Sequence, residues 1–302
     1  MELKQLQYFM AVCEDLHFTR AAEKLGIAQP SLSQQIRLLE HEVGTPLFHR
    51  IGKKIVMTEA GTLLRNHGYN VFHELKQART AINDLQGLKR GALKIGALLT
   101  VVNYLLPQAV IDFHRSYPGI ELSVLGLRTG DIYDGLLRNE LDLGIVMLPI
   151  EHNDLDAVPL YNGKMALAAP ADHPITSHPH VTLEILRRMP SVLLPGNYSM
   201  RQLIDEKCQT YGFTPRPVME MTTMESIVNM VGKGIGVTIL PEAYLDYIDN
   251  KAIRKVPIRE PEMTIQIGIV YRKNKHLCAA SHLFMERLID TTKDIYPFNK
   301  EK

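Results

Sequence analysis

Two short helical patterns, separated by only a few residues, constrain the fold of this chain most strongly. The first pattern ends at Gly26, because glycine readily adopts the left-handed conformation that stops a helix. Only Ile27 and Ala28 intervene before a second pattern begins at Gln29-Pro30-Ser31, and proline suits a first helical turn because no intrahelical bond needs its missing N–H. Two helices joined by so tight a connection predict a helix-turn-helix.

The second helix has a polar face with the chemistry of a DNA-contacting surface. Leu32, Ile36 and Leu39 form its apolar stripe, while Thr19 is expected to cap the helix before it. Gln and Arg can bond base edges bidentately, and Ser can bond bases or phosphates. The same pattern also suits a helical hairpin whose polar face is only hydrated. On the DNA-binding interpretation, the expected contacts are Thr19, Gln29, Pro30, Ser31, Ser33, Gln34 and Arg37.

A basic hairpin is expected after these helices. Residues 47–58 predict two strands that turn at Gly52-Lys53, which would present Arg50, Lys53 and Lys54 to a phosphate backbone. Residues 1–90 hold 12 Lys and Arg against 9 Asp and Glu, whereas the whole chain has a net charge of only +1. This basic first segment is compatible with nucleic-acid binding.

An ordered set of motifs over residues 3–61 closely resembles the signature of LysR-type transcriptional regulators. The motifs are Ala21-Ala22 with Leu25, Gln29-Pro30-Ser31-Leu32-Ser33, Ile36 with Leu39-Glu40, Gly44-Thr45-Pro46-Leu47-Phe48 with Arg50, and Thr58-Glu59-Ala60-Gly61. The resemblance implies a winged helix-turn-helix in residues 1–58 that binds an interrupted palindrome in the double-stranded DNA of a promoter. It also implies a dimerising helix and a two-lobed effector domain in the rest of the chain.

Residues 59–88 predict one long helix without proline. Its apolar positions are Leu64, Val71, Leu75, Ala78, Ile82 and Leu85, and from Val71 onward their spacing alternates between four and three. This spacing is typical of a coiled-coil seam, although Gly68 stands where the seam needs an apolar residue. A helix packed on its own domain is the alternative. The resemblance implies self-association through this helix, as a dimer or a dimer of dimers.

From residue 91 onward, strand and helix patterns alternate. Strands at 93–97, 120–125 and 143–147, with helices at 101–115 and 131–138, predict a parallel sheet with right-handed crossovers. A second set of patterns predicts strands at 165–169, 191–194, 217–221, 236–240 and 264–270, and helices at 200–211, 224–231 and 276–292. The resemblance implies an α/β effector domain of the periplasmic-binding-protein-like (type 2) fold in residues 91–302. Lobe 1 is expected at about 91–160 and 266–302, and lobe 2 at about 161–265. The whole chain would then be α/β with an all-α-plus-wing N-terminal domain.

Three strand-to-helix loops are the expected effector site, because ligands of such sheets bind at the carboxyl ends of the strands. Helix N-termini there favour an anion such as a carboxylate, and Arg128 could add a counter-charge. The hydroxyl residues could instead be helix caps only, and Arg128 could be only solvated. The expected effector-binding residues are Leu99, Thr100, Arg128, Thr129, Asn197 and Ser199.

Other classes of function find little support in the residues. No catalytic motif is found, so we expect no enzyme, no metal site and no cofactor. Cys13, Cys208 and Cys278 lie far apart, which argues against peroxide sensing through a cysteine pair, a mechanism that some LysR-type proteins use. No apolar stretch predicts a membrane span, and Met1–Gln5 lacks the pattern of a secretion signal, so a cytoplasmic protein is expected. A DNA-binding regulator without a small-molecule effector, and an enzyme or solute-binding protein fused to a DNA-binding domain, are the alternatives.

Overall fold

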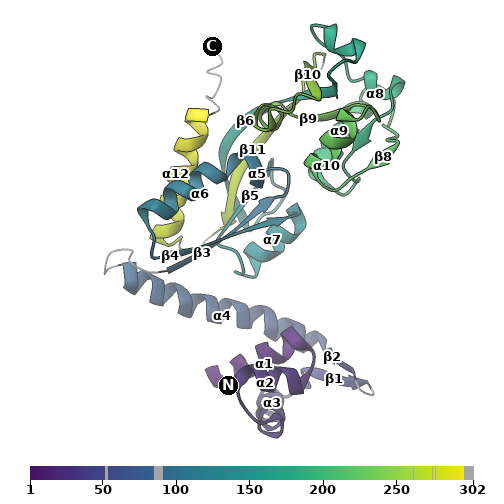
Figure 1. The fold of residues 1–302 in the computed structure, drawn as a ribbon. Coiled ribbons are helices and arrows are strands. Elements are labelled where there is room, and N and C mark those ends of the chain that lie inside the picture. The colour runs from purple at the N-terminus through teal and green to yellow at the C-terminus, as the bar shows by residue number, and fades with distance from the viewer. Residues whose placement is uncertain (52–53, 85–90, 261, 274, 276, 296–302) are drawn as a thin grey trace. The chain divides into compact units, whose positions relative to one another are not determined.

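The computed structural model describes residues 1–51, 54–84, 91–260, 262–273, 275 and 277–295. The chain divides into two compact units, Met1–Arg79 and Thr80–Lys302, and each has an apolar core of its own (Figure 1). No helix in the described part of the chain is long and apolar enough to cross a membrane.

The first unit is built on three helices that pack against one another: α1 (Leu3–Asp15), α2 (Phe18–Leu25) and α3 (Gln29–Val43). Gly26 ends α2 in the left-handed conformation, with φ of 66°, as the sequence predicts. The cap at the other end of α2 is His17, whose ring nitrogen accepts a hydrogen bond from the N–H of Arg20. The expectation that Thr19 caps this helix is therefore wrong, because the helix starts one residue before Thr19.

The hairpin and the long helix complete this part of the chain. Strands β1 (Phe48–Ile51) and β2 (Lys54–Met57) pair antiparallel, which confirms the predicted hairpin, and its turn at Gly52-Lys53 is outside the described residues. Helix α4 (Glu59–Asp84) follows, and the rest of the predicted span, 85–88, is also outside them. Thr58 caps α4, since its Oγ1 accepts a hydrogen bond of 2.9 Å from the N–H of Gly61.

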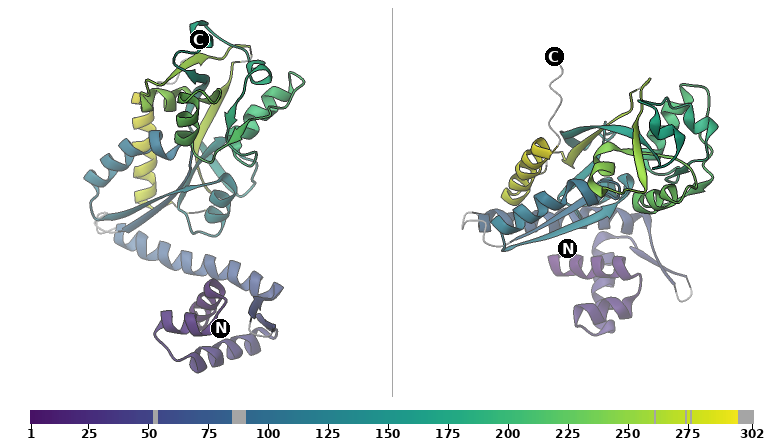
Figure 2. Two further views of the ribbon diagram at one scale, coloured as in Figure 1. Left: turned by 45° about the vertical axis from the view of Figure 1, so that its right-hand side comes forward. Right: turned by 45° about the horizontal axis from the view of Figure 1, so that its top comes forward.

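The second unit contains the predicted α/β sheet, with one difference. Strand β3 pairs in parallel with β4 and β5, but β11 runs antiparallel to both β5 and β6, so the sheet is mixed rather than all parallel. Helices α6 and α12 cover one face of this sheet and α7 covers the other (Figures 1 and 2). The bounds are β3 (Gly91–Leu98), α5 (Val102–Leu105), α6 (Pro107–Ser116), β4 (Ile120–Leu127), α7 (Thr129–Leu137), β5 (Leu143–Leu148), β11 (Thr264–Arg272) and α12 (Ala279–Ile295).

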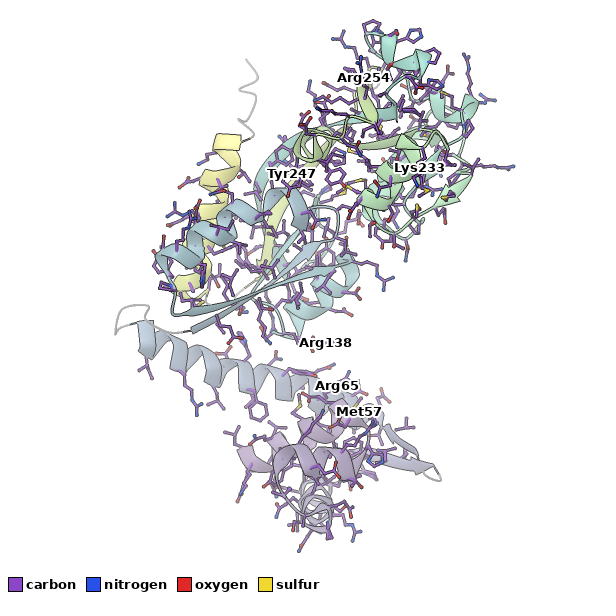
Figure 3. All side chains as sticks on the ribbon, viewed as in Figure 1. Met57, Arg65, Arg138, Lys233, Tyr247 and Arg254 are labelled. Atoms are coloured by element: carbon purple, nitrogen blue, oxygen red, sulfur yellow. The ribbon has the colours of Figure 1, made fainter. Side chains whose placement is uncertain are left out.

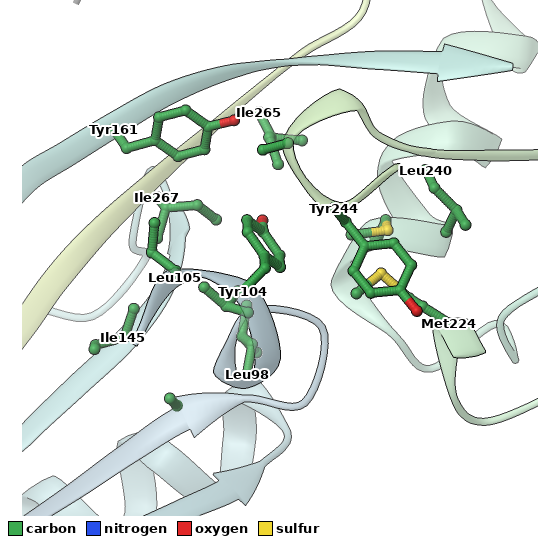
Figure 4. Packing of buried hydrophobic residues seen from close by; sticks show 14 of the residues in the cluster. Leu98, Tyr104, Leu105, Ile145, Tyr161, Met224, Leu240, Tyr244, Ile265 and Ile267 are labelled. Carbon is green, nitrogen blue, oxygen red and sulfur yellow. The ribbon is translucent and has the colours of Figure 1, made fainter. Parts of the chain in front are cut away.

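Strand β6 (Leu155–Pro170) runs through both lobes of this unit. Its first part pairs with β11, and its last part pairs with β9 and β10 of the second lobe. Buried residues of the two lobes form one continuous core, part of which is shown in Figure 4. The remaining elements are η1 (Pro174–Ser177), α8 (Ile185–Arg188), β7 (Val192–Leu193), α9 (Ser199–Gln209), β8 (Met219–Glu220), α10 (Met224–Gly232), β9 (Thr238–Pro241), α11 (Glu242–Ile248) and β10 (Ile253–Pro257).

Two elements differ from those the sequence predicts. The helix expected at 101–115 is divided into α5 and α6 around Leu106, because the missing N–H and the ring of Pro107 interrupt a helix. The strand expected at 165–169 is the end of the 16-residue β6. Helix α11 and strand β10 have no counterpart among the expected elements.

Candidate DNA interface and effector cleft

Helix α3 has an exposed polar face. Ser33 does not belong to it, because this residue is only 7% exposed and its Oγ accepts a hydrogen bond of 2.8 Å from Nε2 of Gln29. Successive helix residues are turned by about 100°, so Ser33 lies only about 60° from Ile36, at the edge of the buried stripe. The expectation that Ser33 points outward is wrong, and its hydroxyl instead holds the Gln29 side chain. The exposed residues of the face are Gln29, Pro30, Ser31, Gln34 and Arg37, and Thr19 of α2 is also exposed.

Residues of the sequence motifs fix the hairpin relative to α3. Oε1 of Glu40 accepts hydrogen bonds from the N–H groups of Leu47, at 2.8 Å, and Phe48, at 3.2 Å. Gly61 lets α4 approach the same segment, because a Cβ there would overlap the carbonyl oxygen of Leu47. In the hairpin itself, the side chains of Arg50 and Lys54 and the whole of Lys53 are outside the described residues.

The apolar stripe of α4 has two different environments along the helix. Leu64 packs on the core of the first unit, and a Cβ at Gly68 would come 2.8 Å from the sulfur of Met10. That close approach explains the glycine in the predicted seam. The later positions, which we call the α4 stripe, are exposed: Val71 by 40%, Leu75 by 42%, Ile82 by 59%, and Ala78 as well. Leu85 is outside the described residues.

Three loops of the second unit meet at one cavity. The cavity is lined by residues 98–100 at the end of β3 and just after it, 127–129 between the end of β4 and the start of α7, and 197–200 before and within the first turn of α9. All six residues expected to bind the effector belong to this lining. The loops come together because β3 and β4 are parallel neighbours, while α9 of lobe 2 faces their carboxyl ends.

A hydrogen bond between the lobes closes this cavity. Thr129 is the first residue of α7 and Ser199 the first of α9, and their hydroxyl oxygens are 2.6 Å apart. The capping residues are Arg128 and Tyr198, and neither side chain accepts a hydrogen bond from a backbone N–H of its helix, so the first-turn N–H groups are available to an anion. The cavity has a volume of about 20 Å³, which is room for about one water.

The Arg128 side chain is less available to a ligand than its position at the cavity implies. Its Nε lies 3.3 Å from Oδ2 of Asp131, one turn further along α7, and both side chains are about half exposed. Exposed ion pairs of this kind contribute little stability. An anion in the cavity could therefore draw Arg128 away from Asp131 at small cost.

Comparison with known proteins gives matches along nearly the whole chain. The family model of the LysR substrate binding domain matches residues 86–293, and that of the bacterial regulatory helix-turn-helix protein of the lysR family matches residues 3–62. The chain belongs to the LysR family. It is a DNA-binding transcriptional regulator with an effector-binding domain, which confirms the family, the fold and the general function that the sequence predicts.

Individual LysR-family relatives are similar over more than nine tenths of their lengths. The HTH-type transcriptional regulator AlsR of Bacillus subtilis is 30% identical over 91% of this chain and 92% of its own. The dual regulator OxyR of Escherichia coli is 31% identical over 92% and 91%. The solved structure of a full-length OxyR variant from Pseudomonas aeruginosa, 28% identical, covers 96% of this chain and 97% of its own with a TM-score of 0.74.

The surroundings of two cysteines in this LysR-family chain disfavour redox sensing by their thiols. Some relatives are named hydrogen peroxide-inducible genes activators, and a sensing thiol has to ionise. All three cysteines are free and buried. Burial raises the pKa of Cys13 and of Cys208 to about 12. These two thiols are therefore almost wholly protonated at neutral pH.

Sequence reasoning missed one residue that organises the cleft of this LysR-family domain. Arg201 of α9 is buried, and its Nη1 donates hydrogen bonds of 2.9 Å to the carbonyl oxygen of Leu194 and to Oε1 of Glu220. Its Nε donates to Oδ1 of Asp205 at 2.8 Å. Arg201 thus ties the start of α9 to the loop that carries Asn197. In the sequence, the i,i+4 spacing of Arg201 and Asp205 indicates their ion pair but neither of the other two hydrogen bonds.

Proposed function

We propose that this LysR-family protein is a cytoplasmic regulator, without enzymatic activity, that responds to a small organic anion bound between the two lobes. The observation that carries the proposal is the convergence of six expected residues, from three separate loops, on one cavity. Its assigned segments are the DNA-binding domain at 1–58, the linker helix at 59–88, and the effector domain at 91–302, with lobe 1 at about 91–160 and 266–302. We infer a cytoplasmic location because a DNA-binding regulator has to reach DNA.

The chemistry of the cavity favours a carboxylate that carries an apolar part. The uncapped N-termini of α7 and α9 offer N–H groups, and Arg128 offers a positive charge. Leu98 and Leu99 supply apolar surface at the same wall. An aliphatic or aromatic acid satisfies both requirements.

Effector binding must separate the lobes. A space of about 20 Å³ cannot hold an organic acid, and the hydroxyls of Thr129 and Ser199 are bonded to each other between the two helices. The effector would replace this hydrogen bond with its own bonds to both hydroxyls. A ligand shifts the arrangement of the lobes only through different affinities for the closed and open forms.

For the DNA-binding part, we assign base contacts to the exposed α3 residues Gln29, Gln34 and Arg37, and backbone contacts to the hairpin. The exposed α4 stripe is proposed to join two subunits, because four apolar side chains in helical register are costly to leave in water. A dimer, or a dimer of dimers, would place two α3 helices on the halves of an interrupted palindrome.

A thermal-shift series on the full-length protein tests the effector proposal. A panel of aliphatic and aromatic carboxylates is compared with the corresponding neutral amides at equal concentration. At 100 times its Kd, an acid that binds only the folded protein should stabilise it by about 2.7 kcal/mol, while its amide should not. Equal shifts from acid and amide, or no shift from any acid, would contradict an anion site. The second result would favour the alternative of a regulator without an effector.

A further inference from the structure

A groove lies within lobe 1, between the edge strand β4 and helix α7. Strand β4 is the last strand of its sheet, and α7 packs on the neighbouring strands β3, β5 and β11. The face of β4 beside α7 is therefore left partly open, and Leu125 on this face is 43% exposed. The groove, which we call the β4–α7 groove, has a volume of about 500 Å³, within the range of small-molecule sites.

The β4–α7 groove runs away from the effector cavity. Its lining residues all belong to lobe 1, and Leu127 is the residue that the two linings share. The effector cavity is at the carboxyl ends of β3 and β4, whereas Lys94, which lines the groove, lies four residues before the end of β3, about 13 Å along the strand. The groove is also on the α7 side of the sheet, opposite to the side that α6 and α12 cover (Figure 2).

Two of the charged side chains in this lining have no counter-charge. Arg138, labelled in Figure 3, lies 3.5 Å from Asp134, and Asp131 is held in the ion pair described above. The side chains of Lys94 and Glu140 are exposed and make no ion pair or hydrogen bond with any described residue. One positive and one negative charge therefore line the same groove without pairing with each other.

A zwitterion satisfies both of these charges at once. An α-amino acid carries an ammonium and a carboxylate on one carbon, so Glu140 can bind the ammonium while Lys94 binds the carboxylate. A simple anion or a simple cation would leave one of the two side chains unpaired, and that side chain would repel it. Lys94 is opposite Ser123 in the parallel register, so Leu125 is the next residue along the same face. The charged end of the groove is thus followed by apolar surface.

We propose that the β4–α7 groove is a second ligand site, which binds a free amino acid with an apolar side chain. Glu140 bonds the ammonium, Lys94 bonds the carboxylate, and Leu125 and Leu127 contact the side chain of the ligand. Binding needs no change in the arrangement of the lobes, because lobe 1 supplies every lining residue. The site is therefore independent of the proposed effector cavity.

Calorimetric titration of the full-length protein with L-leucine and with L-phenylalanine tests this site. At least one of the two should bind saturably, with one ligand per chain. Glu140→Gln and Lys94→Gln should each weaken this binding about tenfold, as the loss of one charge-assisted hydrogen bond. Leu125→Ala should weaken it about threefold, as the loss of apolar contact. The matched control is Glu206→Gln, which removes the same charge from the exposed surface of α9 outside the groove and should leave the affinity unchanged.

The amide of the amino acid that binds gives a sharper test of the role of Lys94. The amide keeps the ammonium but has no carboxylate, so it should bind about tenfold more weakly than the amino acid. Lys94→Gln should not weaken amide binding further, whereas Glu140→Gln should weaken it about tenfold. An equal loss for the amino acid and its amide in Lys94→Gln would contradict the contact between Lys94 and the carboxylate.

Three results would overturn the proposal as a whole. The first is no saturable binding of either amino acid. The second is an equal loss in Glu140→Gln and Glu206→Gln, which would show that only the net charge of the protein matters. The third is weaker amino-acid binding in Thr100→Val but not in Glu140→Gln. That result would place the amino acid in the effector cavity, so it would support the proposed anion site while removing the second one.

Discussion

The proposed DNA-binding face of α3 and the proposed effector cleft each contain a hydrogen bond between polar side chains, and the two bonds have opposite consequences. On α3, the bond of 2.8 Å from Gln29 to Ser33 lies along one helix and leaves the polar face open. In the cleft, the bond of 2.6 Å between Thr129 and Ser199 joins two lobes and closes the site. On these proposals, the face of α3 would bind DNA without rearrangement, whereas the cleft would lose its internal hydrogen bond before a ligand enters. A mutation on the face of α3 should therefore change DNA affinity directly. In the cleft, a mutation can remove both a bond to the effector and the internal bond that opposes effector binding, so its two effects on effector affinity partly cancel.

The largest effect is expected from charge in the α4 stripe. The double variant Leu75→Glu, Ile82→Glu places carboxylates in a seam that should be buried between subunits, so light scattering should give monomers. Losing the second DNA-binding domain should reduce operator affinity by about 10²–10⁴-fold, because the two half-sites no longer bind together. The control is Leu63→Glu, at a residue of the same helix that is 61% exposed outside the stripe. A double variant that remains dimeric would place the interface elsewhere.

A smaller loss is expected at the open face of α3. Arg37→Ala should cost about 1–3 kcal/mol at the specific site and relax the preference at one base position. Ser33→Ala is the matched comparison, because Ser33 is buried and can act only through Gln29, so its loss should be smaller than that of Arg37→Ala. Gel-shift titrations with specific and scrambled operators measure both. If Arg37→Ala lowers the affinity for both operators equally, Arg37 contacts only the DNA backbone.

The fold of the first unit is predicted well from the sequence, because the contacts that define this unit are made by residues close together in the chain or by residues of the family motifs. Thr58 caps α4 three residues before Gly61, and the single carboxylate of Glu40 orders the start of the hairpin. The prediction for Ser33 is wrong because polarity alone does not place a residue on the far side of a helix. In helical projection Ser33 is adjacent to the buried stripe, so the correct placement needs no tertiary information.

In the effector domain, strand order was enough to bring the loops of Thr100 and Thr129 together, since carboxyl ends of neighbouring parallel strands meet at one edge. The role of Arg201 could not be predicted, because two of its partners, Leu194 and Glu220, are fixed only by the tertiary fold. The closure of the cleft could not be predicted from the sequence either. It depends on a contact between residues 70 positions apart.

The smallest effects, and the most informative about closure, are expected from single hydroxyl removals in the cleft. Thr100 lines the cavity and takes no part in the bond between the lobes, so Thr100→Val should lose a ligand hydrogen bond and weaken effector binding by about 0.5–1.5 kcal/mol. Ser199→Ala loses a similar bond to the ligand, but it also removes the internal bond that the effector must break. The two changes offset each other, so the net loss of effector affinity should be smaller than for Thr100→Val. Calorimetry with an acid found in the thermal-shift series measures both variants, and operator binding without effector, measured by gel shift, should stay close to that of the wild type. A loss in Ser199→Ala that exceeds the loss in Thr100→Val would mean that the hydrogen bond between the lobes does not oppose effector binding.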